Sequence, residues 1–267
     1  MKIVNPASGA VIADVAADSA AAVRRKYQAA RAGQAAWAKL PLARRIATIA
    51  AFRERIVAMH ETLARTLTEE VGKPIRQSRN ELNGLLTRID FFLAASAKTL
   101  REEKVHADAG QKLDERITHE PLGVVANISA WNYPYFVGSN VFVPALIAGN
   151  AVLYKPSEYA ALTGLHIAEM LHEAGVPTDV FVPVIGAGAT GAALLRLPVD
   201  GVFFTGSYAT GAKIAAAAGK RMLKVQLPRG RNEWAGVPIL PWRLLGVGCW
   251  GPGRPGSWCL SRWATHG

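Results

Sequence analysis

The sequence predicts an α/β protein whose core is a parallel β-sheet flanked by helices. The chain has 267 residues and half of them are hydrophobic, which is enough apolar material for a packed core. From residue 123 onward, short apolar segments alternate with helical patterns, whereas the first hundred residues carry long helical patterns. Strands and helices that alternate in this way form parallel βαβ units with right-handed crossovers.

Three long helices are expected before residue 101. The alanine-rich segment from Asp18 to Leu40 forms the first, with Asp18 as its N-cap. Pro41 opens the second helix, and Gly72 and Pro74 end it. Its apolar residues recur at three- and four-residue steps and so line one face: Ile46, Ile49, Phe52, Ile56, Met59, Leu63, Leu67 and Val71. The third helix carries Leu82, Leu86, Ile89, Leu93 and Leu100.

A polar stretch from Glu102 to Glu120 separates these helices from the strands, and it has two open interpretations: a solvent-facing hairpin, or an arm that reaches a partner subunit. The strands are then expected at residues 123–129, 151–155, 180–185, 201–205 and 223–227. The helices between them are expected at residues 132–147, 161–174, 190–197 and 207–218. In such a sheet, ligands bind at the carboxyl ends of the strands.

Unusual residues follow four of the strands. In chain order they are Ala130-Trp131-Asn132-Tyr133-Pro134, Pro156-Ser157-Glu158, Gly186-Ala187-Gly188 and Gly206-Ser207-Tyr208-Ala209-Thr210-Gly211. Glycines between a strand and a helix let backbone N–H groups approach a phosphate, and the helix dipole favours its charge. Neither glycine group is a G-x-G-x-x-G motif or a P-loop, so a tight βα connection is the simpler interpretation of each one alone.

Three polar side chains near these turns also have two interpretations each. Lys155 ends a strand and is either a loop cation or a donor to a nucleotide ribose, with Glu158 as the carboxylate acceptor for two hydroxyls. Asn132 is either an ordinary turn residue or an amide donor to an oxyanion, because a side-chain amide stabilises charge without titrating. The order of all four turns along the chain decides between these interpretations.

The composition changes near residue 228. From Pro228 to Gly267 there are five arginines and no lysine, Glu233 is the one acidic residue, and five of the seven tryptophans lie there with both cysteines. The segment has neither helical nor strand periodicity, and its tryptophans argue against an ordinary linker. A GC-rich gene translated in the wrong frame yields such a composition. We therefore interpret residues 228–267 as an aberrant, frameshifted tail.

Several classes of protein are excluded by composition. The net charge is +11, but basic and acidic residues are interspersed in residues 1–227, so no nucleic-acid partner is expected. No apolar run is long enough for a membrane span, and the N-terminus lacks the apolar core of a signal peptide. Cys249 and Cys259 form no metal-ligand motif, so no metal is expected. These observations favour a cytoplasmic location.

The order of the motifs resembles the aldehyde dehydrogenase superfamily. The matching motifs are Asn5-Pro6-Ala7-Ser8-Gly9, Glu70-Val71-Gly72-Lys73-Pro74, Glu120-Pro121-Leu122-Gly123-Val124, Trp131-Asn132-Tyr133-Pro134, Lys155-Pro156-Ser157-Glu158 and Phe204-Thr205-Gly206-Ser207. They cover residues 1–227 in collinear order, and the chain looks like the succinate-semialdehyde and broad-specificity aldehyde enzymes. The resemblance implies an aldehyde dehydrogenase-type fold with a Rossmann-like sheet, here incomplete, because the C-terminal half of the family fold is not in the sequence.

The resemblance also implies roles for individual residues. Asn132 is the catalytic oxyanion donor, Lys155 and Glu158 hold the adenosine ribose, and Gly206 to Gly211 lie along the pyrophosphate. The full set of cofactor-binding residues is Lys155, Ser157, Glu158, Gly188, Gly206, Ser207 and Gly211. NAD is expected rather than NADP, because the carboxylate of Glu158 repels a 2′-phosphate. The intact family acts on small aldehydes and forms homo-oligomers, with residues 102–120 in the oligomerisation region.

The chain departs from the family after residue 227. A general-base glutamate opens a Glu-Leu-Gly-Gly motif in the family, but Pro228-Arg229-Gly230-Arg231 stands there, and proline accepts no proton. Glu233 is interpreted as a loop carboxylate. Cys259 is faintly similar in its setting to the family's nucleophile, and we interpret this as coincidence. The sequence thus predicts descent from NAD-dependent aldehyde dehydrogenases and an inactive chain; the alternative is a non-catalytic nucleotide-binding or subunit-interaction module.

Overall fold

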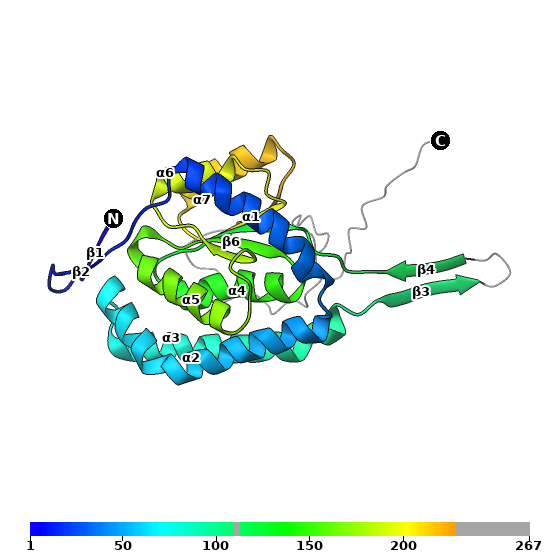
Figure 1. Cartoon of the computed structure of the whole chain (residues 1–267), viewed down its shortest axis with the longest axis horizontal. Coiled ribbons are helices and arrows are strands. Elements are labelled where there is room, and N and C mark those ends of the chain that lie inside the picture. Colours follow the sequence, from blue (N-terminus) through cyan, green and yellow to red (C-terminus); the bar gives the residue numbers. More distant parts are fainter. Residues whose placement is uncertain (109–112, 228–267) are drawn as a thin grey trace.

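A computed structural model describes residues 1–108 and 113–227, and a five-stranded parallel sheet lies at its centre (Figure 1). The strands are β5 (Val124–Ile128), β6 (Ala151–Lys155), β7 (Phe181–Pro183), β8 (Gly201–Phe204) and β9 (Lys224–Gln226). Every residue of β5 and β6 is buried, as expected for central strands of a parallel sheet covered on both faces. The predicted α/β class and the Rossmann-like parallel sheet are confirmed.

The strand order is β7-β6-β5-β8-β9, so the chain reverses its direction of travel across the sheet beside β5. β6 and β7 lie on one side of β5, and β8 and β9 lie on the other. All neighbouring strands in this sheet are parallel, with Val125 opposite Val152 in β6 and opposite Gly201 in β8. Such a reversal opens a crevice at the carboxyl ends of the strands, where open α/β sheets bind ligands.

Helices cover both faces of the sheet. They are α4 (Pro134–Ile147), α5 (Ala161–Glu173), α6 (Gly188–Leu195) and α7 (Tyr208–Gly219). Figure 1 shows α6 and α7 on one face beside the first helix of the chain, and α4 and α5 on the other. These four helices and the five strands lie within a few residues of the positions that the sequence predicts.

The three N-terminal helices are α1 (Ala20–Lys39), α2 (Leu42–Val71) and α3 (Ile75–Thr99), as predicted. The paired helices α2 and α3 pack outside α4 and α5, so the apolar stripe of α2 is buried. One local prediction was wrong, because Ser19, not Asp18, is the N-cap of α1. The carboxylate of Asp18 instead accepts hydrogen bonds from Lys26 Nζ (2.6 Å) and the backbone N–H of Ile185 (2.7 Å), which tie this segment to the sheet.

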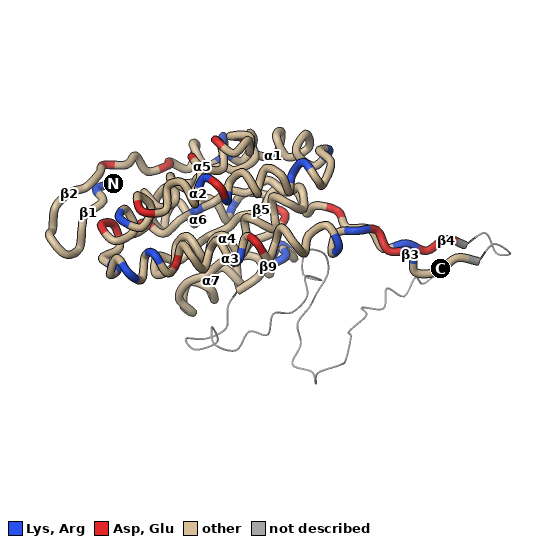
Figure 2. Tube along the Cα trace, turned by 90° about the horizontal axis from the view of Figure 1, so that it is seen from below, with Lys and Arg blue, Asp and Glu red and all other residues tan. Residues whose placement is uncertain are grey.

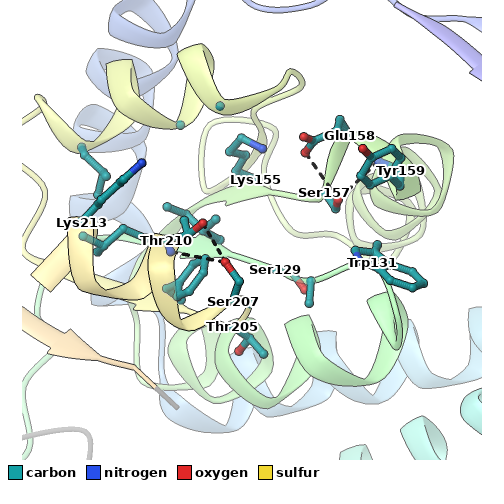
Figure 3. Close-up of a pocket in the computed structure, with 18 of the residues that line it drawn as sticks. Ser129, Trp131, Lys155, Ser157, Glu158, Tyr159, Thr205, Ser207, Thr210 and Lys213 are labelled. Carbon is teal, nitrogen blue, oxygen red and sulfur yellow. Dashed lines mark hydrogen bonds between the residues drawn. The ribbon is translucent and has the colours of Figure 1, made fainter. Parts of the chain in front are cut away.

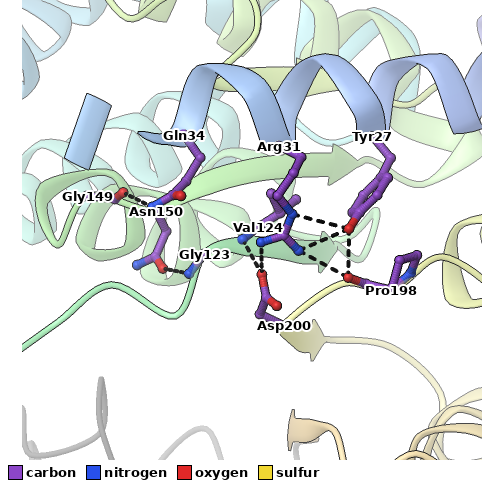
Figure 4. A network of polar contacts seen from close by, with 9 residues as sticks. All are labelled: Tyr27, Arg31, Gln34, Gly123, Val124, Gly149, Asn150, Pro198 and Asp200. Atoms are coloured by element: carbon purple, nitrogen blue, oxygen red, sulfur yellow. Dashed lines mark hydrogen bonds and ion pairs between the residues drawn. The ribbon is translucent and has the colours of Figure 1, made fainter. Parts of the chain in front are cut away.

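A polar network joins α1 to the amino end of β5 (Figure 4). Arg31 Nη1 lies 2.7 Å from Asp200 Oδ2, which also accepts a hydrogen bond of 2.7 Å from the backbone N–H of Val124. Tyr27 Oη and Arg31 Nη2 both donate to the carbonyl oxygen of Pro198. Gly123 has a φ of +124°, and a Cβ there would collide with Asp200. The network therefore requires glycine at position 123.

Two antiparallel hairpins lie outside the layers. β1 (Lys2–Val4) and β2 (Val11–Asp14) form one, which the sequence analysis did not predict. β3 (Glu103–Asp108) and β4 (Leu113–Ile117) form the other, and Figures 1 and 2 both show it extending away from the body of the molecule. This is the hairpin that was one of the two interpretations of the polar stretch.

The described part of the chain carries charges of both signs, distributed along its helices and strands (Figure 2). Figure 2 shows the positions of Lys and Arg interspersed with those of Asp and Glu along the trace of the helices and of the β3–β4 hairpin. None of the described helices is both long enough and apolar enough to cross a membrane. Among the described residues there is also no group of three or more His, Cys, Asp or Glu side chains that could hold a metal ion.

Candidate cofactor-binding site

A pocket with a cavity volume of about 890 Å³ opens at the carboxyl ends of β5, β6 and β8 (Figure 3). Its walls come from the β5–α4 turn, the segment after β6, one face of α6, and the turn that leads from β8 into α7. The predicted site residues that line it are Asn132, Lys155, Ser157, Glu158, Gly188, Gly206 and Ser207. The fold thus brings together residues from four separate strand ends, as the strand order requires.

Lys155 is the last residue of β6 and is the buried cation of the pocket. Its side chain is 5% exposed, and Nζ donates a hydrogen bond of 3.1 Å to the carbonyl oxygen of Pro156. Burial lowers the pKa of Lys155 because it removes water from the ammonium group, and the negative charge of Glu158 acts in the opposite direction. A lysine with one weak internal acceptor retains donors for a ligand oxygen.

Glu158 begins the short 3-10 helix Glu158–Ala160, directly after β6. Ser157 is the N-cap of that helix, because its Oγ accepts a hydrogen bond of 3.3 Å from the backbone N–H of Tyr159. The Ser157 hydroxyl also lies 3.5 Å from Glu158 Oε2. Ser157 therefore fixes the turn on which Glu158 stands, and the Glu158 carboxylate lines the pocket as an acceptor beside the donor Lys155.

The N-terminus of α6 contributes backbone N–H groups to the pocket. Ala187 is the N-cap and makes no side-chain capping hydrogen bond. Gly188 has no atom within 4 Å of the position that a Cβ would take, so the wall is open there, whereas a Cβ at Gly186 (φ +149°) would collide with Thr190. The small residues Gly188, Gly191 and Ala192 line one helix face towards the pocket. This wall admits a ligand close to the backbone.

The N-terminus of α7 faces the same pocket. Ser207 is its N-cap and accepts a hydrogen bond of 3.3 Å from the backbone N–H of Thr210. A Cβ at Gly206 would lie 2.5 Å from Phe204 Cζ, so a larger residue there would displace the Phe204 ring. Gly211 is the one predicted site residue that does not line the pocket. It lies inside α7, where a Cβ would be 3.5 Å from a ring carbon of Phe204. Its place in the structure is a helix-to-strand packing contact.

Several lining residues are not among the individual site residues named from the sequence, although Thr210 falls within the range Gly206 to Gly211 that was assigned to the pyrophosphate. Trp131 and Tyr159 are 51% and 64% exposed and flank the mouth of the pocket, and Thr210 and Lys213 line it from α7. Thr210 and Lys213 follow Ser207 at three-residue steps, so the helical period of α7 was the signal that could have found them. No cysteine or histidine lies among the described lining residues. Pro228, Glu233 and Cys259, on which the predicted loss of catalysis depends, lie outside the described residues.

Comparisons with known proteins show the family to which the chain belongs. The model of the aldehyde dehydrogenase family matches residues 1–237, which includes the first ten residues of the segment interpreted as aberrant. An N-succinylglutamate 5-semialdehyde dehydrogenase from Chromobacterium violaceum is 38% identical over 209 residues, which are 78% of this chain and 42% of that protein. A 3,6-anhydro-alpha-L-galactose dehydrogenase from Streptomyces coelicolor is 35% identical over 232 residues, 86% of this chain and 46% of that protein.

Solved structures of this family share the fold. PnpE in complex with nicotinamide adenine dinucleotide has a TM-score of 0.80 at 35% identity, over 85% of this chain and 47% of that one. The P. syringae indole-3-acetaldehyde dehydrogenase AldA in complex with NAD+ has a TM-score of 0.81 at 34% identity, over 86% and 47%. The chain spans about half the length of the curated relatives that it matches. On these matches and on this site, the chain belongs to the aldehyde dehydrogenase family.

Proposed function

We propose that the pocket binds NAD through the residues that the sequence analysis assigned to it. The observation that carries the proposal is the convergence of one buried lysine, one carboxylate and two helix N-termini on a single cavity. The N-termini of α6 and α7 supply N–H donors and positive dipole ends for a pyrophosphate. Lys155 and Glu158 supply a donor and an acceptor for the hydroxyls of the adenosine ribose.

The described residues fit this cofactor in size as well as in charge. The cavity of about 890 Å³ is at the upper end of the range for small-molecule sites, which suits a dinucleotide. The open wall at Gly188 allows a phosphate to reach the backbone of α6. Glu158 is the basis for proposing NAD rather than NADP, since a carboxylate beside the ribose repels a 2′-phosphate. PnpE and AldA, which share this fold, are described as complexes with the same dinucleotide.

The activity that accompanies this cofactor in the family is oxidation of an aldehyde to a carboxylate, with NAD supplying the hydride acceptor. Asn132, at the rim of the pocket, is the side chain that we assign to the oxyanion. A thiolate nucleophile and a glutamate base complete that chemistry in the family. Pro228 stands where the base belongs, so we propose that this chain binds NAD without turning over an aldehyde.

The remaining assignments follow from this proposal. A small aldehyde is the substrate class of the family, and the cytoplasm is the location that suits a protein with the composition described above. The extended β3–β4 hairpin, with Val105 57% exposed and Ile117 46% exposed, supports a role in homo-oligomer contacts. It is also the observation that favours the alternative function, a subunit-interaction module that binds nucleotide without catalysis.

Calorimetric titration of the full-length chain with NAD tests the proposed function, using Lys155→Met and the matched variant Lys220→Met. Lys220 is an exposed lysine at the C-terminal end of α7, outside the pocket. We expect NAD to bind to the unaltered chain and to Lys220→Met with equal affinity. Loss of one charge-assisted hydrogen bond should weaken binding to Lys155→Met by about tenfold or more. Equal affinity in all three proteins, or no binding to the unaltered chain, would refute the proposal.

A further inference from the structure

Lys73 is a buried lysine directly beneath the turn that carries Asn132. It stands between α2 and α3 and is 9% exposed. Its Nζ donates one hydrogen bond to the carboxylate of Glu81 and another to the backbone carbonyl oxygen of Asn132. The same ammonium group lies 3.8 Å from the centroid of the Tyr133 ring, which is a cation–π distance. One cation thus contacts two consecutive residues of the β5–α4 turn.

Glu81 completes the connection from the other side. It lies on α3, is 3% exposed, and its Oε1 accepts hydrogen bonds from the backbone N–H groups of Tyr135 (2.8 Å) and Phe136 (3.2 Å). These are first-turn donors of α4, so Glu81 caps the helix that follows the turn. Burial raises the pKa of Glu81, while Lys73 and the two amides act to lower it. Its second oxygen faces Lys73.

The two residues therefore hold the turn at both ends. Lys73 fixes the carbonyl group of Asn132 and the ring of Tyr133, and Glu81 fixes the start of α4 two residues later. Among the described residues, Asn132 makes one hydrogen bond, in which its backbone carbonyl oxygen accepts from Lys73 Nζ. The side chain of Asn132 lines the pocket. Displacing a hydrogen-bond donor by about 1 Å from the reacting atoms can lower the rate of an enzyme by about 100-fold. The residues that fix the backbone of such a turn therefore affect the rate through the position of the donor.

We infer that Lys73, acting with Glu81, is the positioning residue for the side-chain amide of Asn132. The inference rests on the proposed function, because it concerns the residue to which the oxyanion is assigned. Neither Lys73 nor Glu81 lines the pocket, so neither contacts a ligand there. Their effect reaches the site through the backbone of residues 132–136, and removing the ammonium group should release the Asn132 amide while the cofactor-binding residues on β6 keep their places.

The test uses the NMR signals of the Asn132 side-chain amide in the full-length chain, identified by their loss in Asn132→Asp. In Lys73→Met we expect these signals to shift or broaden, and the affinity for AMP, which occupies the Lys155 and Glu158 end, to stay unchanged. Lys26→Met is the matched control. Lys26 Nζ also donates to one carboxylate, Asp18 (2.6 Å), and to one carbonyl oxygen, Pro183 (2.7 Å), away from this turn.

The outcomes separate the inference from general destabilisation. A change of the Asn132 signals in Lys73→Met but not in Lys26→Met supports the inference; the same change in both variants, or none in either, overturns it. If Lys73→Met does not fold, Tyr133→Leu removes only the cation–π contact, and we then expect a smaller displacement of the same signals; their constancy in that variant overturns the inference. Failure of NAD to bind to the unaltered chain would refute the proposed function instead, because the amide signals report on the turn without cofactor.

Discussion

At the scale of single residues, the pocket depends on the charge of Lys155. Desolvation lowers the pKa of this ammonium group from its ordinary value of 10.5, and Glu158 partly opposes the shift. In the proposed complex the charged form donates to the ribose, so the Glu158 carboxylate would have two functions there: it would accept a hydroxyl, and it favours the protonated lysine.

Binding of NAD should consequently weaken at alkaline pH. Below the pKa of Lys155 the dissociation constant is flat, and above it the constant should rise with pH, because the charged form becomes scarce, until it reaches the value expected for Lys155→Met. Since the pKa is lowered, this rise begins below the pH expected for an ordinary lysine. Calorimetry between neutral and alkaline pH measures it. Lys155→Arg, which stays charged throughout, should show no such rise; an identical profile in that variant would contradict the assignment.

Glu158→Gln should change the choice between the two nicotinamide dinucleotides. Removal of the carboxylate removes repulsion of a 2′-phosphate and keeps one hydrogen-bond acceptor for the ribose. We expect the ratio of NADP affinity to NAD affinity to rise by about tenfold, which is about 1.4 kcal/mol. Paired titrations with the two dinucleotides measure the ratio. A ratio that stays constant would show that Glu158 does not face the 2′ position.

At the scale of elements, Gly123 shows how one backbone position connects two layers. It has a φ of +124°, and a Cβ there would collide with the Asp200 carboxylate that pairs with Arg31 of α1. Gly123→Ala should lower the free energy of unfolding by about 1–3 kcal/mol, through backbone strain and loss of the network. Gly219→Ala is the control, because nothing lies within 4 Å of a Cβ there. Equal thermal stability in the two variants would contradict this account.

The elements that depend on local sequence were predictable. The strand β6 was predicted residue for residue, and α2 ends at Gly72, where φ is +77°. The hairpin of β1 and β2 was missed because its strands are only three and four residues long, and Ile3 is buried by packing against Ile185 and Ala161, which are distant in sequence. Short strands that depend on non-local contacts leave no periodic pattern.

The candidate site was predictable to a similar degree and for a similar reason. The site residues were predicted from glycines and polar residues at strand ends, and seven of the eight line the pocket. This signal is available in the sequence because the carboxyl ends of parallel strands meet at one edge of the sheet. Gly211 was assigned to the pyrophosphate with its neighbours; it does not line the pocket, and a Cβ at this position would lie 3.5 Å from a ring carbon of Phe204. Lys73 and Glu81 come from α2–α3, whose approach to the β5–α4 turn no local pattern indicates.

At the scale of the whole molecule, our proposal separates cofactor binding from catalysis. The pocket is built entirely from residues that the structure describes, whereas the base and nucleophile of the family correspond to positions after residue 227. Along the described trace, Lys and Arg residues are interspersed with Asp and Glu residues (Figure 2). A bound cofactor should also stabilise the folded state by mass action.

The full-length chain should form no NADH from NAD and an aldehyde. Groups that act as a catalytic unit lose most of their acceleration when one is missing, so any NADH formation should be at least about 10⁴-fold slower than in an enzyme with the base and nucleophile in place. Absorbance of NADH in the presence of small aldehydes measures this. Formation of NADH that is abolished by Cys259→Ser would contradict the prediction and would assign Cys259 a catalytic role.

The most direct measurement of the central claim is chemical-shift mapping of NAD on the full-length chain. Our account predicts changes at the backbone amides of residues 155–158, 186–191 and 206–210, and none along the β3–β4 hairpin at residues 103–117. Changes confined to the hairpin or to the outer helices, or no changes at saturating NAD, would contradict the claim that this pocket is the cofactor site.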